Sequence, residues 1–153
     1  MRPLNCVCRM LLAANVAGLN TGHADEPATN AEREQRIVDY LSGAKFVGRY
    51  TTDSDASANA KPETYTISKV EKLPAADSYR LTSRIEYGDT DAEVPIDLKI
   101  LWSGSTPVIT LDDIWIPGMG KFSARVLIHQ GRYSGTWSHD EKGGHLFGRV
   151  VKE

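Results

Sequence analysis

Cysteine is scarce in this sequence of 153 residues, and its two copies, Cys6 and Cys8, both lie near the N-terminus. The rest of the chain therefore offers no disulfide, no thiolate nucleophile and no cysteine ligand for zinc. Catalytic signatures are also missing, since the sequence contains no Gly-x-Ser-x-Gly elbow, no His-Glu-x-x-His motif and no glycine-rich phosphate loop. These absences favour a protein without catalytic activity, and an enzyme of unknown type is the least favoured alternative.

The sequence also has fewer basic residues than acidic ones. Lys and Arg number 18 against 20 Asp and Glu, which gives a formal net charge of −2 at pH 7. A mildly acidic chain has no electrostatic attraction to nucleic acid or to anionic lipid. The apolar run at residues 10–19 is too short to span a bilayer as a helix. We therefore expect neither nucleic-acid binding nor stable membrane insertion.

Residues 1–24 have the order of features found in a secretory signal peptide. Arg2 and Arg9 make the start basic, an apolar run follows, and the small residues Gly22 and Ala24 stand at the positions that a signal peptidase reads. An ordinary buried helix is the alternative. We expect cleavage near Ala24 and a secreted or periplasmic protein. Because both cysteines precede the apolar run, a lipid anchor is not expected.

Residues 25–44 are predicted to form a polar lead-in and one short helix. Thr29 and Glu32 have the spacing of a capping box, in which each side chain satisfies a backbone donor at the start of the helix. Glycine at position 43 is a typical helix stop. Between these points one face of the helix is apolar, formed by Ile37, Val38 and Leu41.

Residues 45–153 are predicted to form strands and turns only. The segments 79–87, 94–102 and 121–129 alternate apolar and polar side chains, which is the repeat of a strand with one buried face. A change of phase within a further segment predicts a β-bulge near Lys69. The remaining segments complete a set of eight, and their ranges are 45–52, 63–72, 106–116, 131–138 and 145–151.

Eight short strands with no helix between them indicate that neighbouring strands pair antiparallel. We predict an all-β fold, an eight-stranded antiparallel up-and-down β-barrel preceded by one short N-terminal helix. The alternative is a β-sandwich. Closure into a barrel is favoured because it removes the exposed strand edges that promote aggregation. A barrel of this size is either filled by side chains or just wide enough for one small ligand, and the sequence leaves both outcomes open.

The first predicted strand carries Gly48-Arg49-Tyr50, and the last one carries Arg149. With the short helix ahead of eight strands, these features make the chain resemble the lipocalin and calycin superfamily of small secreted β-barrels. That family has Gly-x-Trp in the first strand, where this chain has tyrosine, and a basic residue at the end that stacks on the ring. A second motif, Gly135-Thr136-Trp137, is similar to one of avidin-type barrels. The resemblance implies a pocket that is open at one end and closed at the other by the helix.

Inward-pointing aromatic and aliphatic side chains are the candidates for lining such a pocket, because rings with a polar edge suit amphipathic ligands. They would equally fill a dry core. The candidates are Tyr79, Leu81, Tyr87, Leu98, Trp102, Tyr133 and Trp137. Near the open mouth, Trp115, Ile116 and Met119 are predicted to form an exposed apolar lip, of the kind found at a ligand entrance or a partner surface.

The links between strands at the open end are rich in acids, and two histidines flank the last turn. Asp89, Asp91, His139 and His145 are the residues with groups that bind divalent cations, and the histidines could face each other across the hairpin. The alternative is that turns favour Asp, Ser and Gly for their backbone geometry. We favour the alternative and expect neither a metal nor a cofactor.

Two functions are compatible with these features. The first is non-catalytic binding of a small, partly apolar or amphipathic ligand inside the barrel. The second is a protein-interaction module, such as an inhibitor or an envelope factor, with a filled core and with Trp115 and the loops as its contact surface. The volume of the barrel interior separates them.

Overall fold

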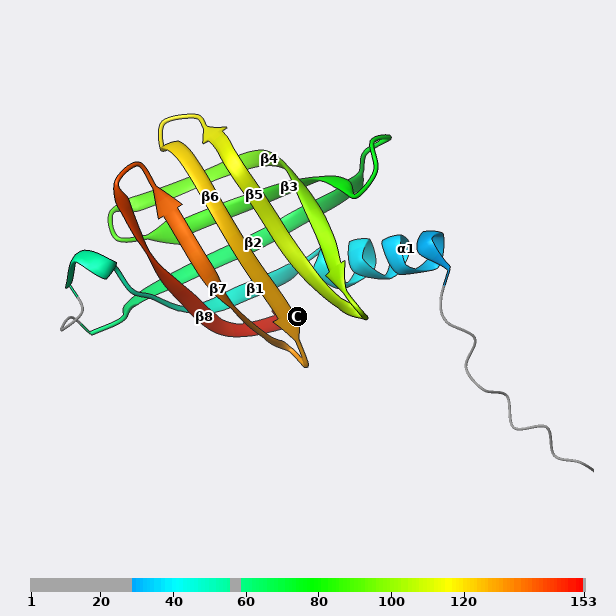
Figure 1. The fold of residues 1–153 in the computed structure, drawn as a ribbon, viewed down its shortest axis with the longest axis horizontal. Coiled ribbons are helices and arrows are strands. Elements are labelled where there is room, and N and C mark those ends of the chain that lie inside the picture. Colours follow the sequence, from blue (N-terminus) through cyan, green and yellow to red (C-terminus); the bar gives the residue numbers. More distant parts are fainter. Residues whose placement is uncertain (1–28, 56–58, 153) are drawn as a thin grey trace, which may run out of the picture.

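The computed structural model describes residues 29–55 and 59–152, so the predicted signal peptide lies outside the described residues. They form one helix, α1 (Asn30–Leu41), one short 3-10 helix, η1 (Asp53–Asp55), and eight strands (Figure 1). The strands are β1 (Ala44–Tyr50), β2 (Lys61–Lys72), β3 (Ser78–Tyr87), β4 (Thr90–Ser103), β5 (Thr106–Ile116), β6 (Gly120–His129), β7 (Arg132–His139) and β8 (Lys142–Lys152).

The eight strands form one closed antiparallel barrel. Each strand pairs with its neighbours in the sequence, and residues 146–152 of β8 pair with the whole of β1. The predicted up-and-down barrel is therefore confirmed. The alternative of a β-sandwich is wrong, because β1 is hydrogen-bonded on both sides and no edge remains between two sheets. In the described part of the chain, no helix is long and apolar enough to cross a membrane.

Helix α1 lies at one end of the barrel (Figure 1). Its predicted capping box is confirmed: the Thr29 backbone N–H donates to Glu32 Oε2 at 2.9 Å, and the Glu32 N–H donates to Thr29 Oγ1 at 3.3 Å. Ile37 and Leu41 are buried in the core that α1 shares with the strands. α1 therefore closes its end of the barrel, and the opposite end is the open end, where η1 and the β3–β4, β5–β6 and β7–β8 hairpins lie.

Two β-bulges change which side chains face the interior. The predicted bulge in β2 is confirmed between Ile67 and Lys69. A second bulge, which the sequence analysis missed, lies in β5 between Leu111 and Ile114. Its Asp113 has a φ of 49°, and the Asp113 backbone N–H donates to Ser123 Oγ at 2.9 Å. The extra residue reverses the alternation of the following segment.

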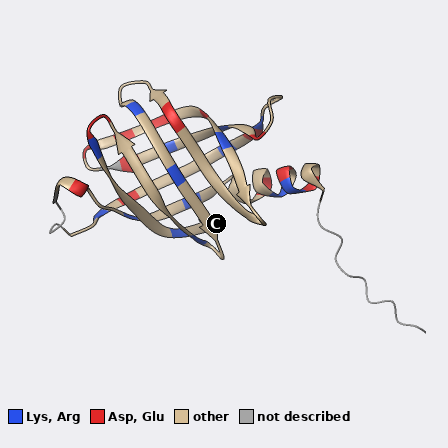
Figure 2. Cartoon of the chain, in the orientation of Figure 1, with Lys and Arg blue, Asp and Glu red and all other residues tan. Residues whose placement is uncertain are grey.

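Charged residues are distributed over the strands, α1 and the turns (Figure 2), and nearly all of those described are exposed or half-buried. On the outer face, Arg80 holds Asp97 through two hydrogen bonds of 2.6 and 2.8 Å, and Arg84 holds Asp91 through two of 2.7 and 2.6 Å. Such exposed pairs are screened by water and contribute little to stability. Among the described residues, Glu63 is the one acidic or basic residue that is buried, with 3% of its surface exposed.

Candidate ligand-binding site

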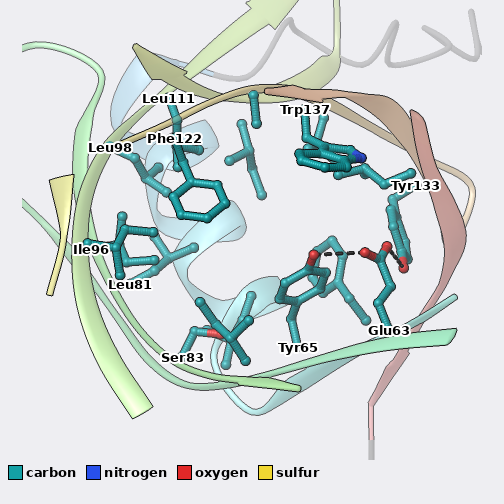
Figure 3. Close-up of a pocket in the computed structure, with 18 of the residues that line it drawn as sticks. Glu63, Tyr65, Leu81, Ser83, Ile96, Leu98, Leu111, Phe122, Tyr133 and Trp137 are labelled. Atoms are coloured by element: carbon teal, nitrogen blue, oxygen red, sulfur yellow. Dashed lines mark hydrogen bonds between the residues drawn. The ribbon is translucent and has the colours of Figure 1, made fainter. Parts of the chain in front are cut away.

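The barrel is hollow on the open side of α1. It encloses a cavity of about 180 Å³, bounded by side chains from all eight strands (Figure 3). Most of the wall is apolar, and small residues such as Ser83 and Ala124 leave the space unfilled. One lining residue from each strand, in order from β1 to β8, is Phe46, Tyr65, Leu81, Leu98, Ile109, Phe122, Tyr133 and Leu146.

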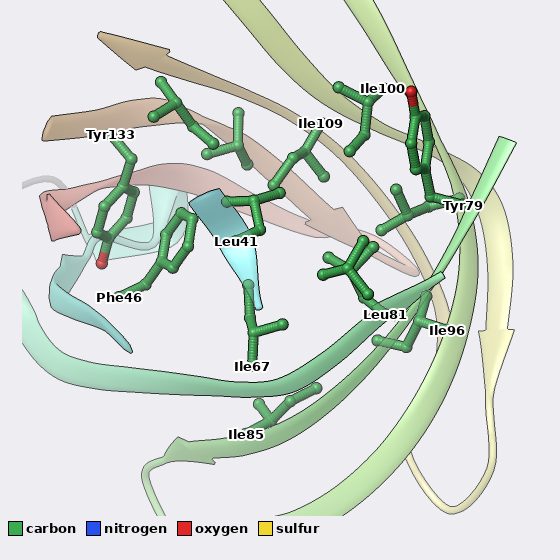
Figure 4. Packing of buried hydrophobic residues seen from close by; sticks show 14 of the residues in the cluster. Leu41, Phe46, Ile67, Tyr79, Leu81, Ile85, Ile96, Ile100, Ile109 and Tyr133 are labelled. Atoms are coloured by element: carbon green, nitrogen blue, oxygen red, sulfur yellow. The ribbon is translucent and has the colours of Figure 1, made fainter. Parts of the chain in front are cut away.

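The cavity includes four of the seven residues predicted to line it, namely Leu81, Leu98, Tyr133 and Trp137. For Tyr79 and Trp102 the prediction is wrong, because both lie where β3 begins and β4 ends, at the α1 end of the barrel. Tyr79 is fully buried there (Figure 4), and Trp102 lies under the Arg33 guanidinium, 4.7 Å from the ring centroid. The side chain of Tyr87 lies outside the described part of the structure.

The predicted lip is divided by the bulge in β5. Trp115 points outward with 63% of its surface exposed, whereas Ile116 is buried and lines the cavity together with Met119. The prediction of one continuous exposed apolar lip is therefore wrong. Its cause is the reversed alternation after Asp113, which places Ile116 and not Trp115 on the inward face.

Trp137 forms part of the wall near the open end. Its indole Nε1 donates to the Thr51 carbonyl oxygen at 3.1 Å, and its ring meets Tyr50 edge to face, with ring centroids 6.0 Å apart. The indole lies close to Gly144, where a side chain would occupy the space held by the Thr51 carbonyl. The hydrogen bond and the edge-to-face contact together orient the Trp137 ring in the wall.

Glu63 brings a carboxyl group into this apolar wall. Tyr65 donates its hydroxyl to Glu63 Oε2 at 2.8 Å, and Tyr133 donates to Glu63 Oε1 at 2.9 Å (Figure 3). Burial raises the pKa of Glu63 above its ordinary value, although the two hydroxyl donors act in the opposite direction. Among the described residues, no Lys or Arg forms an ion pair with Glu63 or lowers its pKa. The cavity thus contains an acidic group without a cation.

Two glycines allow Tyr133 to reach Glu63 from the far side of β1 and β8. Glu63, Gly48, Gly148 and Tyr133 form one row across β2, β1, β8 and β7. A side chain at Gly48 would occupy the space of the Tyr133 hydroxyl, and one at Gly148 would meet the Tyr133 ring. The ring therefore lies across bare backbone. This close approach explains why the motif Gly48-Arg49-Tyr50 begins with glycine.

Sequence analysis did not single out Glu63, although a signal for it exists. Glu63, Tyr65 and Ile67 share one face of β2 by the alternation of a strand, and the other two are apolar or aromatic. A charged residue at an inward position of such a pattern indicates a buried acid. Its partner Tyr133 is 70 residues away in the sequence, and no local pattern relates the two.

The structure does not bring the candidate metal ligands together. His139 stacks on Phe122, with ring centroids 4.3 Å apart, and its Nε2 lies 3.2 Å from Asp140. His145 lies opposite Thr136 on the outer face, so the expectation that the two histidines could face each other is wrong. Asp91 is held by Arg84, and Asp89 is exposed in its turn. In the described part of the chain, no three His, Cys, Asp or Glu side chains are grouped to hold a metal ion.

Comparison with known proteins identifies no relative: no family model, no curated protein and no solved structure matches the chain. The resemblance to lipocalins and calycins stays a prediction.

Replacing Glu63 by glutamine is expected to change how stability depends on pH. Because burial raises its pKa above 4.5, the folded protein holds this proton to a higher pH than the unfolded chain does. The stabilisation from Glu63 is fully present below about pH 4.5 and is lost as pH rises through the folded-state pKa, at up to about 1.4 kcal/mol per pH unit. Between about pH 4 and pH 8, the melting temperature of the Glu63→Gln variant should rise relative to that of the wild type as the pH increases. Parallel curves would contradict a raised pKa.

Proposed function

We propose that the protein is an exported, non-catalytic binding protein that holds one small, largely apolar molecule inside its barrel. The observation that supports this proposal is the cavity of about 180 Å³ with its mostly apolar wall. An apolar cavity of about 150 Å³ can hold benzene, whereas pockets for drug-sized molecules are about 300–1,000 Å³. The expected ligand is therefore about the size of one substituted ring.

Access to the cavity supports the same proposal. Ile116 and Met119 belong to the wall and lie where β5 ends and in the β5–β6 turn, at the end of the barrel opposite α1. Hairpin links can move without breaking the ladder of the barrel. A ligand would enter between these links, and the buried end of α1 closes the other side.

Trp115 supports a second candidate function, a protein-interaction module. With 63% of its surface exposed, its ring stands beside the open end, and exposed tryptophan is enriched where proteins meet partners. This role does not require a hollow interior. Replacing Trp115 by alanine would weaken the binding of such a partner, whereas a ligand in the cavity would stay bound.

Filling the cavity tests the first proposal. Ala124→Leu adds three carbon atoms to the inward face of β6 and should weaken binding of toluene or benzyl alcohol at least about tenfold, because the space for one ring is lost. Leu127→Ala is the matched control, since Leu127 lies on the outer face of the same strand. Titration calorimetry of the three proteins measures the effect. Equal affinity of all three would place binding outside the cavity.

A further inference from the structure

We propose that Glu63 makes the cavity selective for a small organic cation, an apolar amine whose ammonium group binds the Glu63 carboxylate. The inference rests on the proposed function and goes beyond it by naming the class of ligand. It is based on three features of the wall: an acidic group with unused acceptor positions, aromatic rings around that group, and an apolar surface facing it across the cavity.

The carboxylate of Glu63 has room for further donors. An ionised carboxylate offers about four lone-pair sites, and the structure uses one on each oxygen, for Tyr65 and for Tyr133. The two tyrosines come from β2 and β7 and hold the carboxylate in one orientation from two sides (Figure 3). A ligand that donates N–H groups would occupy the remaining sites without displacing either hydroxyl.

Charge favours a cation over a neutral donor. A carboxylate removed from water is stable only when it is paired with a positive charge or protonated. No described Lys or Arg forms an ion pair with Glu63, and burial raises its pKa. An ammonium group would supply the missing charge, and charge-assisted hydrogen bonds are about twice as strong as neutral ones.

Aromatic rings surround the place where the ammonium would lie. Tyr65 and Tyr133 flank the carboxylate, and Phe46 lies with its ring centroid 5.0 Å from that of Tyr133. Trp137 and Tyr50 belong to the same wall. Ring faces attract organic cations, most strongly where water is excluded. These rings therefore favour a cation with an organic body over an inorganic ion.

The opposite side of the cavity suits the rest of such a ligand. Leu81, Ile96 and Leu98 line the wall across from Glu63 (Figure 3), and none of the three carries a polar group. A molecule with an amine at one end and a ring or a short branched chain at the other would match both sides. The cavity of about 180 Å³ limits it to about one ring.

Three probes of nearly equal size test the inference: benzylamine, which is positively charged at neutral pH, and the neutral molecules benzyl alcohol and toluene. By titration calorimetry, the wild-type protein should bind benzylamine at least about tenfold more tightly than either neutral probe, because only the cation forms a charge-assisted pair. Glu63→Gln should lose this preference and still bind the neutral probes, since glutamine keeps the shape of the side chain. Ala124→Leu should weaken all three.

The pH dependence of binding gives a second readout. The groups that face Glu63 are the hydroxyls of Tyr65 on its own strand and Tyr133 on β7, and Tyr50 on β1 lies near enough for the charge of Glu63 to raise its pKa. Burial also raises the pKa of Tyr133, so this group and Tyr50 stay neutral below pH 10. A loss of benzylamine affinity as the pH falls through the raised pKa of Glu63 therefore reports protonation of this group. The neutral probes should show no such loss.

Each outcome discriminates between the two proposals. Neutral probes that bind the wild type as tightly as benzylamine would overturn the selectivity for a cation and leave the proposed function standing. Benzylamine binding that is unchanged in Glu63→Gln would also overturn it. Failure of every probe to bind the wild type, whatever its charge, would overturn the proposed function and the inference with it.

Discussion

Gly48→Ala is expected to lower the free energy of unfolding by about 2–4 kcal/mol. The added methyl group would enter space held by the Phe147 carbonyl oxygen and by the Tyr133 hydroxyl. The first belongs to the backbone of β8 and cannot turn away, and the second is hydrogen-bonded to Glu63. The barrel must therefore widen between β1 and β8, where it closes. Equilibrium unfolding in urea measures the change.

Val47→Ala is the control for this prediction. Val47 is the neighbour of Gly48 on the same strand, points outward and is half exposed, so its truncation should cost less than about 1 kcal/mol. Gly148→Ala should resemble Gly48→Ala, because a side chain there meets the Val47 carbonyl and the Tyr133 ring. If the two glycine variants were as stable as Val47→Ala, the close approach of Tyr133 to the β1–β8 backbone would be wrong.

Tyr133→Ala is expected to cost about 4–6 kcal/mol, the largest single effect in the barrel. Only 2% of the Tyr133 surface is exposed, and its ring packs against Phe46. Truncation would remove the buried ring and also leave Glu63 Oε1 without its donor. The loss of ring packing accounts for most of the cost. The Glu63 carboxyl group, which loses its hydrogen-bond donor, adds about 1–3 kcal/mol.

Tyr133→Phe separates these two contributions. It keeps the ring and removes only the hydroxyl, so it should cost about 1–3 kcal/mol at neutral pH. In the Glu63→Gln background the same substitution should cost less, because a neutral acceptor is less strongly bound than a carboxylate. Urea unfolding of the four proteins forms a double-mutant cycle. Additive costs would show that the Tyr133 hydroxyl and Glu63 do not interact.

Most of the fold could be predicted from local patterns. The spacing of Thr29 and Glu32 predicts the helix start, and the alternation in the strands predicts eight of them with the correct order. The change of phase near Lys69 predicts the first bulge. The second bulge was missed, although Asp112 and Asp113 interrupt the alternation of β5. That bulge decides which of Trp115 and Ile116 enters the cavity.

The candidate site was predicted less well, because lining a cavity depends on depth along the barrel as well as on facing inward. Tyr79 and Leu98 both face inward and lie opposite each other in the register of β3 and β4. Leu98 reaches the cavity, whereas Tyr79 is packed beside α1. Alternation along a strand determines whether a side chain faces the interior or the solvent. Its position along the barrel axis is set by α1 and by the tilt of the strands.

By itself, the sequence determines that the chain forms one short helix and eight strands with an apolar face, because side-chain alternation is a property of each strand alone. Only the tertiary structure decides that the interior is hollow and that Glu63 lies inside it with Tyr65 and Tyr133. The physical reason is distance along the chain. When β8 pairs with β1, four residues that are far apart in the sequence become neighbours, namely Gly48, Glu63, Tyr133 and Gly148. No local sequence pattern predicts that closure.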